Sequence, residues 1–284
     1  VYQMGSINHP GISDLDIICV FKNKSQCFKD FRFDLNSDEK NILTHSMFGI
    51  EERYIVKSMS YNLISNLKFL GGKDLSLHKK EIEISSELKQ QIALEYMVKM
   101  LITIDSQVTL RIVKLRAFLL LAKAIAFDLE LLDIKSGRLY DLVGQVIQYR
   151  ENWFIKKPCR KEITDLALNF NKELRLFLKT KLLESKLYLP VEKLVLPGKF
   201  TILKDSTFSI NHKGLVLPNH FIFLGKKYIN LQYRLNSFIY KLPFNISKID
   251  SLYAQRFEFS KNLVKTNKKK YPSFIPLTTS LSIY

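Results

Sequence analysis

The chain has 284 residues, of which 46% are hydrophobic and 25% charged. This composition excludes a disordered or collagen-like chain and leaves room for more than one packed domain. The net charge of +17 is uneven: residues 1–85 carry 11 basic and 11 acidic side chains, whereas residues 189–284 carry 15 and 4. We therefore expect the last third either to attract nucleic acid through counterion release or to be a solvated basic surface.

The cysteines and the most apolar stretch narrow the class of protein further. Cys19, Cys27 and Cys159 are odd in number and lack the CxxC spacing, which argues against a disulfide framework or a structural zinc site. Residues 117–132 are the most apolar segment, but they include three charged side chains and predict a buried helix rather than a membrane span. Without a hydrophobic signal segment at its start, the chain is expected to be cytoplasmic and to have no membrane span.

Short strands and helices alternate at the beginning of the chain. Residues 1–4 and 14–21 predict strands, the second from its β-branched and apolar run IICVF. Residues 53–60 predict a further strand. Residues 61–70 show helical spacing of leucine and isoleucine, and a Gly-Gly pair follows as a helix stop.

The character of the sequence changes twice after residue 84. Residues 85–188 predict three or four amphipathic helices, beginning at a serine that can cap the first one. After Pro190 the sequence predicts strands over residues 199–205, 206–211 and 214–233. The expected fold class is α+β, with a small mixed-sheet domain at 1–84, a helical bundle at 85–188 and a β-rich basic region at 189–284.

Two aspartates separated by one leucine stand at the entrance of the strand over residues 14–21. On a strand Asp14 and Asp16 point to the same face, about 6.6 Å apart along the backbone. Two carboxylates at ~4 Å and an effective dielectric of ~20 repel by about 4 kcal/mol, a penalty that a divalent cation removes. Mg²⁺, or Mn²⁺ in its place, takes such oxygen ligands and keeps positions for phosphate oxygens. Gly5 would let the backbone approach those phosphates, and Ser6 could bind them.

Together these residues resemble the signature of the polymerase-beta-type nucleotidyltransferase superfamily, and of its small bacterial-type members in particular. The resemblance is carried by Gly5-Ser6, then Ser13-Asp14-Leu15-Asp16 leading into IICVF. The stretch KFLGGKDL at residues 68–75 is similar to the element that closes the catalytic domain in aminoglycoside nucleotidyltransferases. The similarity covers about residues 1–80.

The resemblance implies a role for each matching residue. Gly5 and Ser6 would contact the phosphates of a bound NTP, such as ATP, and Ser13 would fix the loop beside the acids. Asp14 and Asp16 would be the catalytic residues and bind one or two Mg²⁺ ions, which activate the acceptor and stabilise charge on the leaving pyrophosphate.

The sequence departs from the family pattern in two respects. Members of the superfamily usually carry a third acid on a later strand, for which Glu52 and Glu83 are the candidates here. The family also places a helix before the Gly-Ser strand, whereas this sequence starts four residues before Gly5 and without a methionine. We therefore expect its amino terminus to be incomplete.

The function expected from the sequence is Mg²⁺-dependent transfer of a nucleoside monophosphate from an NTP to a hydroxyl or phosphate of a small molecule. An RNA-, oligonucleotide- or protein-modifying nucleotidyltransferase is the enzymatic alternative, and the basic carboxy-terminal third would favour RNA. A catalytically degenerate nucleotide-binding module is the alternative outside enzymes, because the third acid is missing. An acidic side chain within about 5 Å of Asp14 and Asp16 would discriminate between these classes.

Overall fold

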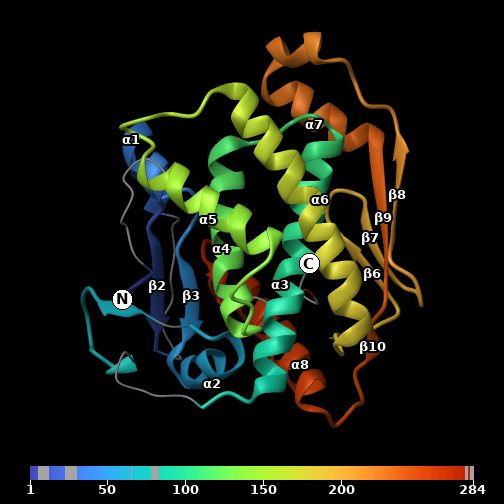
Figure 1. Cartoon of the computed structure of the whole chain (residues 1–284). Helices are drawn as coiled ribbons and strands as arrows, with labels where there is room; N and C mark the ends of the chain where they lie inside the picture. The colour runs from blue at the N-terminus through green and yellow to red at the C-terminus, as the bar shows by residue number, and fades with distance from the viewer. Residues whose placement is uncertain (6–12, 23–30, 65, 78–82, 279–280, 282–284) are drawn as a thin grey trace. The chain divides into compact units, whose positions relative to one another are not determined.

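The computed structural model describes residues 1–5, 13–22, 31–64, 66–77, 83–278 and 281. It divides the chain into two compact units (Figure 1). The sheet unit comprises residues 1–89 and 254–283, and the helical unit comprises residues 90–253. This division differs from the three consecutive domains expected from the sequence. Residues 254–283 belong to the first unit, and the predicted helical region and most of the predicted β-rich region form a single unit.

The sheet unit is built on five strands in the order β11-β3-β2-β1-β4. Their bounds are Tyr2–Met4 for β1, Asp16–Phe21 for β2, Phe48–Glu51 for β3, Leu67–Phe69 for β4 and Ile275–Pro276 for β11. β2 is parallel to β3, with Ile18 opposite Phe48, and antiparallel to β1, with Asp16 opposite Met4. The expected strands at residues 1–4 and 14–21 are confirmed, and the sheet is mixed.

The third strand expected in this region is wrong, because residues 53–60 lie in helix α2 (Glu52–Asn62). Ile55, Met59 and Asn62 are buried at helical spacing, and Ile55 and Met59 join the core with strand residues such as Ile18 and Ile50. Burial along this face outweighs the strand preference of the β-branched residues. The helix expected over residues 61–70 is also wrong, because α2 ends at Asn62 and strand β4 follows at residues 67–69.

Further helices complete the sheet unit. They are the 3₁₀ helix η1 (Phe31–Asp34), α1 (Ser37–Ile42) and α8 (Leu252–Lys270). α8 comes near the end of the chain but packs on the sheet unit. The side chain of Arg256 is fully buried, and its Nε donates a hydrogen bond to the carbonyl of Tyr61 at 2.9 Å. Lys270 Nζ lies 2.7 Å from Glu51 Oε1. The basic carboxy-terminal segment is therefore a helix anchored by specific contacts within this unit.

Four helices dominate the helical unit: α3 (Ser86–Thr109), α4 (Leu115–Leu131), α5 (Arg138–Glu151) and α6 (Arg160–Glu184). The helices expected over residues 85–188 are confirmed, and the apolar segment at 117–132 lies mostly in α4. The Ser85 hydroxyl accepts a hydrogen bond from the backbone N–H of Leu88 at the start of α3, as its capping position predicted.

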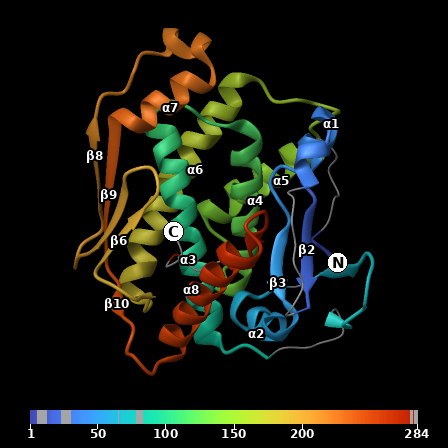
Figure 2. The same ribbon diagram turned by 180° about the vertical axis from the view of Figure 1, so that it is seen from behind.

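A four-stranded sheet in the order β6-β7-β9-β8 packs against these helices (Figures 1 and 2). Its strands are Lys193–Leu196 (β6), Phe200–Lys204 (β7), Ser209–Gly214 (β8) and Asn236–Leu242 (β9), and β5 (Tyr188–Leu189) pairs separately with β10 (Asn245–Ile246). Tyr240 on β9 donates its hydroxyl hydrogen to Asp105 on α3, with the two oxygens 3.0 Å apart.

The description of residues 189–284 as a β-rich region is correct only in part. The expected strand over 214–233 is wrong: η3 (Asn219–Leu224) and α7 (Lys226–Leu235) occupy most of it. Tyr228 and Gln232 are the buried side chains of α7, four residues apart, and α8 buries a face that includes Arg256 and Asn267. Polar residues fill much of these buried faces, so hydrophobic periodicity alone did not reveal the helices.

Two expectations about the whole chain can be compared with the described residues. In the described part, Cys19 and Cys159 form no disulfide, and Cys27 lies outside it. Among the helices so described, none combines the length and the hydrophobicity needed to cross a membrane.

Gly49 on β3 provides a test of the packing in the sheet unit. A Cβ at this position would lie 2.7 Å from Phe274 Cβ and 3.0 Å from Phe21 Cε2. Gly49→Ala is expected to lower the free energy of unfolding by about 1–3 kcal/mol through overpacking. Gly71→Ala is the matched control, because a Cβ there meets no atom within 4 Å. Equal urea midpoints for the two variants, followed by circular dichroism, would contradict the packing around β3.

Candidate metal centre

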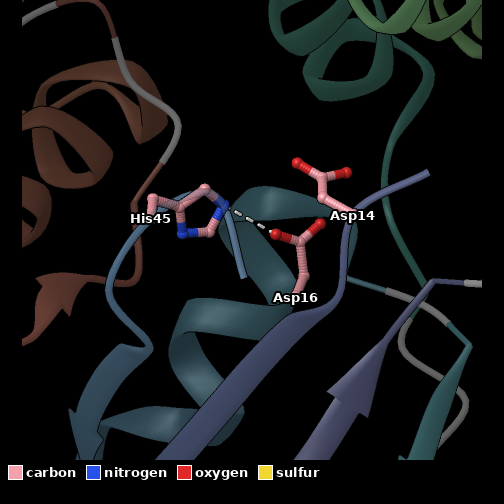
Figure 3. Close-up of side chains that lie close together, drawn as sticks. All are labelled: Asp14, Asp16 and His45. Carbon is pink, nitrogen blue, oxygen red and sulfur yellow. Dashed lines mark ion pairs between the residues drawn. The ribbon is translucent and has the colours of Figure 1, made fainter. Parts of the chain in front are cut away.

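Three side chains converge at the entrance of β2. The carboxylates of Asp14 and Asp16 and the imidazole of His45 each offer a ligand atom, and these atoms all lie within 4.8 Å of one another. Figure 3 shows His45 pointing at Asp16, with Asp14 beside the pair. All three are partly exposed; His45 and Asp16 retain 33% and 30% of their side-chain surface. A group of this kind can be reached from solvent and can hold a metal ion.

The parallel pairing of β2 with β3 brings these residues together. Since Ile18 lies opposite Phe48, the residues that lead into the two strands are neighbours at the same end of the sheet. The backbone N–H of Leu15 donates to the carbonyl of Ile42 at 3.0 Å and holds the two entering segments side by side. Thr44 reinforces this contact, because its hydroxyl donates to Asp14 Oδ2 at 3.0 Å.

Both ring nitrogens of His45 face hydrogen-bond acceptors. Nε2 lies 2.8 Å from Asp16 Oδ1, and Nδ1 lies 2.8 Å from the carbonyl oxygen of Ser46. The hydrogen bond with Asp16 raises the pKa of His45 above its usual range, helped by the Ser46 carbonyl and the charge of Asp14 and opposed by partial burial. The carboxylates therefore favour the protonated form of the ring, whose positive charge offsets theirs.

The Nδ1 contact also fixes the orientation of the His45 ring. Histidines that bind metals usually donate their second ring N–H to a carbonyl or carboxylate, which fixes the tautomer and the ring orientation. Here Nδ1–H donates to Ser46, which leaves Nε2 directed at the carboxylates. Sequence reasoning missed His45, because the residue has no ligand spacing along the chain and joins the aspartates only through the pairing of β2 and β3.

The remaining residues assigned to the site from the sequence have different outcomes. Gly5 directly follows Met4, the partner of Asp16 in the β1–β2 pairing, and so lies next to the cluster in the sheet. Its φ of +72° favours glycine, and a Cβ there would meet no atom of the described residues within 4 Å. Ser6 lies outside the described residues. Ser13 directly precedes Asp14 and is 6% exposed, which suits a role in holding the loop better than direct contact with a ligand.

Neither candidate for the third acid joins the cluster. Phe21 pairs with Glu51, so the far end of β3 is about 17 Å along the strands from Asp16 at about 3.3 Å per residue, and Glu52 lies beyond it as the first residue of α2. Its carboxylate instead lies 3.4 Å from Lys73 Nζ. Glu83 is exposed and belongs to no group of potential metal ligands in the described part of the chain. Among the described residues, the third potential ligand beside the two aspartates is a histidine.

The Gly-Gly-Lys-Asp-Leu stretch has a structural role in the described contacts. Asp74 Oδ1 accepts a hydrogen bond from the Tyr2 hydroxyl at 2.9 Å, and that hydroxyl accepts one from the backbone N–H of Leu75 at 2.6 Å. Tyr2 is 1% exposed, so these bonds satisfy a buried polar group on β1, an inner strand of the sheet. The stretch therefore anchors β1, the strand that leads to Gly5.

Comparisons with protein-family models, with curated proteins and with solved structures give no match to the chain.

The contact between His45 and Asp16 makes stability depend on pH in a definite direction. Because the folded-state pKa of His45 is raised, the contact stabilises the protein fully below the unfolded pKa of about 6.5 and loses this effect as pH rises through the folded pKa. In a chelating buffer, the free energy of unfolding of the wild type should fall over this interval relative to His45→Gln. Asp16→Asn should remove the same titration. Parallel pH curves for wild type and His45→Gln would contradict this electrostatic picture.

Proposed function

We propose that the sheet unit binds a divalent cation at Asp14, Asp16 and His45 and transfers a nucleoside monophosphate from an NTP to an acceptor. The observation that carries this proposal is the convergence of two carboxylates and an oriented imidazole within 4.8 Å, next to Gly5. The sequence resemblance of residues 1–80 to nucleotidyltransferases supplies the reaction class. An acceptor of small-molecule type remains our first choice.

The donor set fits a divalent cation. Asp14 and Asp16 carry two negative charges, which a cation between them would neutralise, and the ring of His45 already lies 2.8 Å from Asp16. Thr44 already holds one oxygen of Asp14, so that carboxylate is oriented before any ion binds. Once bound, the ion would polarise the phosphates and stabilise the negative charge that develops on the pyrophosphate leaving group.

In the proposed reaction, an acceptor oxygen forms a bond to the α-phosphorus of the NTP. The bond between that phosphorus and the oxygen bridging to the β-phosphate breaks, pyrophosphate leaves with the electron pair, and a carboxylate of the aspartate pair takes the acceptor proton. Gly5, which has no side chain and no described atom within 4 Å of where a Cβ would be, would allow the phosphates to approach the backbone. Asp14, Asp16 and their surroundings would chiefly supply positioning and charge stabilisation, which account for most of the catalysis of phosphoryl transfer.

His45 also bears on the choice of ion. Carboxylates suit Mg²⁺ and Mn²⁺ alike, whereas an imidazole nitrogen favours transition metals. We therefore propose Mn²⁺ over Mg²⁺ as the ion bound more tightly, and we expect His45→Gln to weaken Mn²⁺ by about tenfold while changing Mg²⁺ less. Calorimetric titration of both ions into the wild type and the variant measures this difference. An equal loss for both ions would contradict a ligand role for Nε2.

Asp14→Asn and Asp16→Asn test the function. Each should weaken Mn²⁺ binding by about tenfold or more and lower label transfer by about a hundredfold or more, since a charged ligand is lost. The assay supplies the four α-labelled NTPs with Mn²⁺ or Mg²⁺ to pooled sugar phosphates, aminoglycosides, RNA and the protein itself.

The control variant is Asp38→Asn, which removes an exposed carboxylate in the first turn of α1, outside the cluster. It should retain both ion binding and transfer. Full Mn²⁺-dependent transfer by Asp16→Asn would exclude the proposed site.

A nucleotide-binding module without catalysis is the second candidate. The specific observation in its favour is that a histidine, rather than a third carboxylate, completes the cluster in the described residues. This module should show an NTP- and Mn²⁺-dependent rise in melting temperature, lost in Asp16→Asn, but no transfer to any acceptor. Transfer to any member of the pools, abolished in Asp16→Asn, would exclude it.

A further inference from the structure

The helical unit contains a pocket that the metal centre does not use. It has a volume of about 890 Å³, within the size range of small-molecule sites. Aliphatic side chains such as Ile112, Leu115 and Ile163 form much of its lining, with Trp153 beside them. The lining also includes Arg111, Lys157 and Arg160 but no carboxylate among the described residues. A pocket of this composition suits a ligand with an apolar part and a negative charge.

The pocket is held in shape by a buried polar network. Gln232 on α7 is fully buried, and its Nε2 donates to the carbonyl of Leu110 at 3.3 Å and to the Tyr228 hydroxyl at 2.8 Å. Its Oε1 accepts a hydrogen bond from the backbone N–H of Leu217 at 3.0 Å. These bonds tie the α3–α4 turn, α7 and the segment before η3 together, so the walls of the pocket come from rigidly connected elements.

Arg111 occupies an unusual position in this turn. Its φ of +57° is a left-handed conformation, for which glycine is usual after a helix. The chain nevertheless carries an arginine there, and that residue lines the pocket. Neither Arg111 nor Arg160 forms an ion pair with an acid among the described residues. Their charge is therefore available to an anionic partner.

Two segments beside the pocket share the same pattern. In residues 153–157 Phe154 and Ile155 are 74% and 85% exposed, and two lysines follow. In residues 221–227 Phe223 is 79% exposed, with partly exposed apolar neighbours, and two lysines follow again. Members of both segments line the pocket, and Figures 1 and 2 show α7 near the first turns of α6. We call residues 153–160 and 221–227 the basic apolar face.

We propose that the basic apolar face binds the surface of a membrane that contains anionic lipids, with the pocket receiving part of a lipid. Exposed aromatic and aliphatic side chains next to lysines are the combination that inserts into the interface of an anionic bilayer. Nucleic acid fits this face less well. Phenylalanine rings can stack on bases, but Ile155, Ile222 and the aliphatic lining offer bases neither stacking surfaces nor hydrogen bonds.

Vesicle flotation of the full chain tests this proposal. The protein should float with vesicles of phosphatidylcholine and phosphatidylglycerol and much less with phosphatidylcholine alone. The triple variant Phe154→Ser, Ile155→Ser, Phe223→Ser should bind the anionic vesicles about tenfold more weakly, and so should Lys157→Gln combined with Arg160→Gln.

Matched controls use residues of the helical unit outside this face. Leu183, Val195 and Ile249 are 62%, 59% and 89% exposed, and the triple variant of these residues to serine should float like the wild type. Lys179→Gln with Lys193→Gln is the control for charge. Asp16→Asn should also bind vesicles normally, because the proposal is independent of the metal centre.

Three kinds of outcome would overturn the proposal. The first is equal flotation with neutral and anionic vesicles, or equal losses in the control and test variants. The second is binding of a dispersed short-chain phosphatidylglycerol without binding to vesicles, which would indicate a soluble amphiphile instead. The third is binding of single-stranded RNA that the same variants weaken, without binding to vesicles.

Discussion

The parallel pairing of β2 with β3 is the constraint on which the sheet unit depends. Its register, with Ile18 opposite Phe48, places the entrances of both strands at one end of the sheet. Asp16 and His45 meet there, and the core beneath them combines residues of β2, β3 and α2. A shift of the register by one residue would separate the carboxylates from the imidazole and turn the buried side of β2 outward. The packing of the core and the geometry of the site thus depend on the same strand register.

Charge is distributed differently in the two units. In the sheet unit, the charged side chains at the sheet and at the candidate site form pairs: Glu51 contacts Lys270, and Asp16 contacts His45. In the helical unit, cations around one pocket lack acidic partners among the described residues. The net charge of +17 is therefore no guide to a partner by itself. The location of the charge is more informative about a partner, and here cationic side chains lie beside exposed apolar ones around a pocket whose described lining has no carboxylate.

The carboxy-terminal helix shows how sequence order and spatial order diverge. α8 follows the strands of the helical unit in sequence, yet most of its residues belong with the sheet unit, where Arg256 contacts Tyr61. Its buried face includes Arg256 and Asn267, whose side chains donate hydrogen bonds to backbone carbonyls that come into reach only in the folded chain. Hydrophobic periodicity does not predict such a face, because burying its polar groups costs free energy unless hydrogen-bond partners are present in the folded chain.

The sequence by itself determined the α+β class, the strands at residues 1–4 and 14–21, the four long helices and the choice of the two aspartates as candidate metal ligands. These features depend on local spacing, which the chain carries whether or not it is folded. The tertiary structure decided the third member of the cluster, because His45 lies 29 positions from Asp16 and no local pattern links them. It also decided α2, α7 and α8, since burial against distant segments overrode the local preferences of their residues.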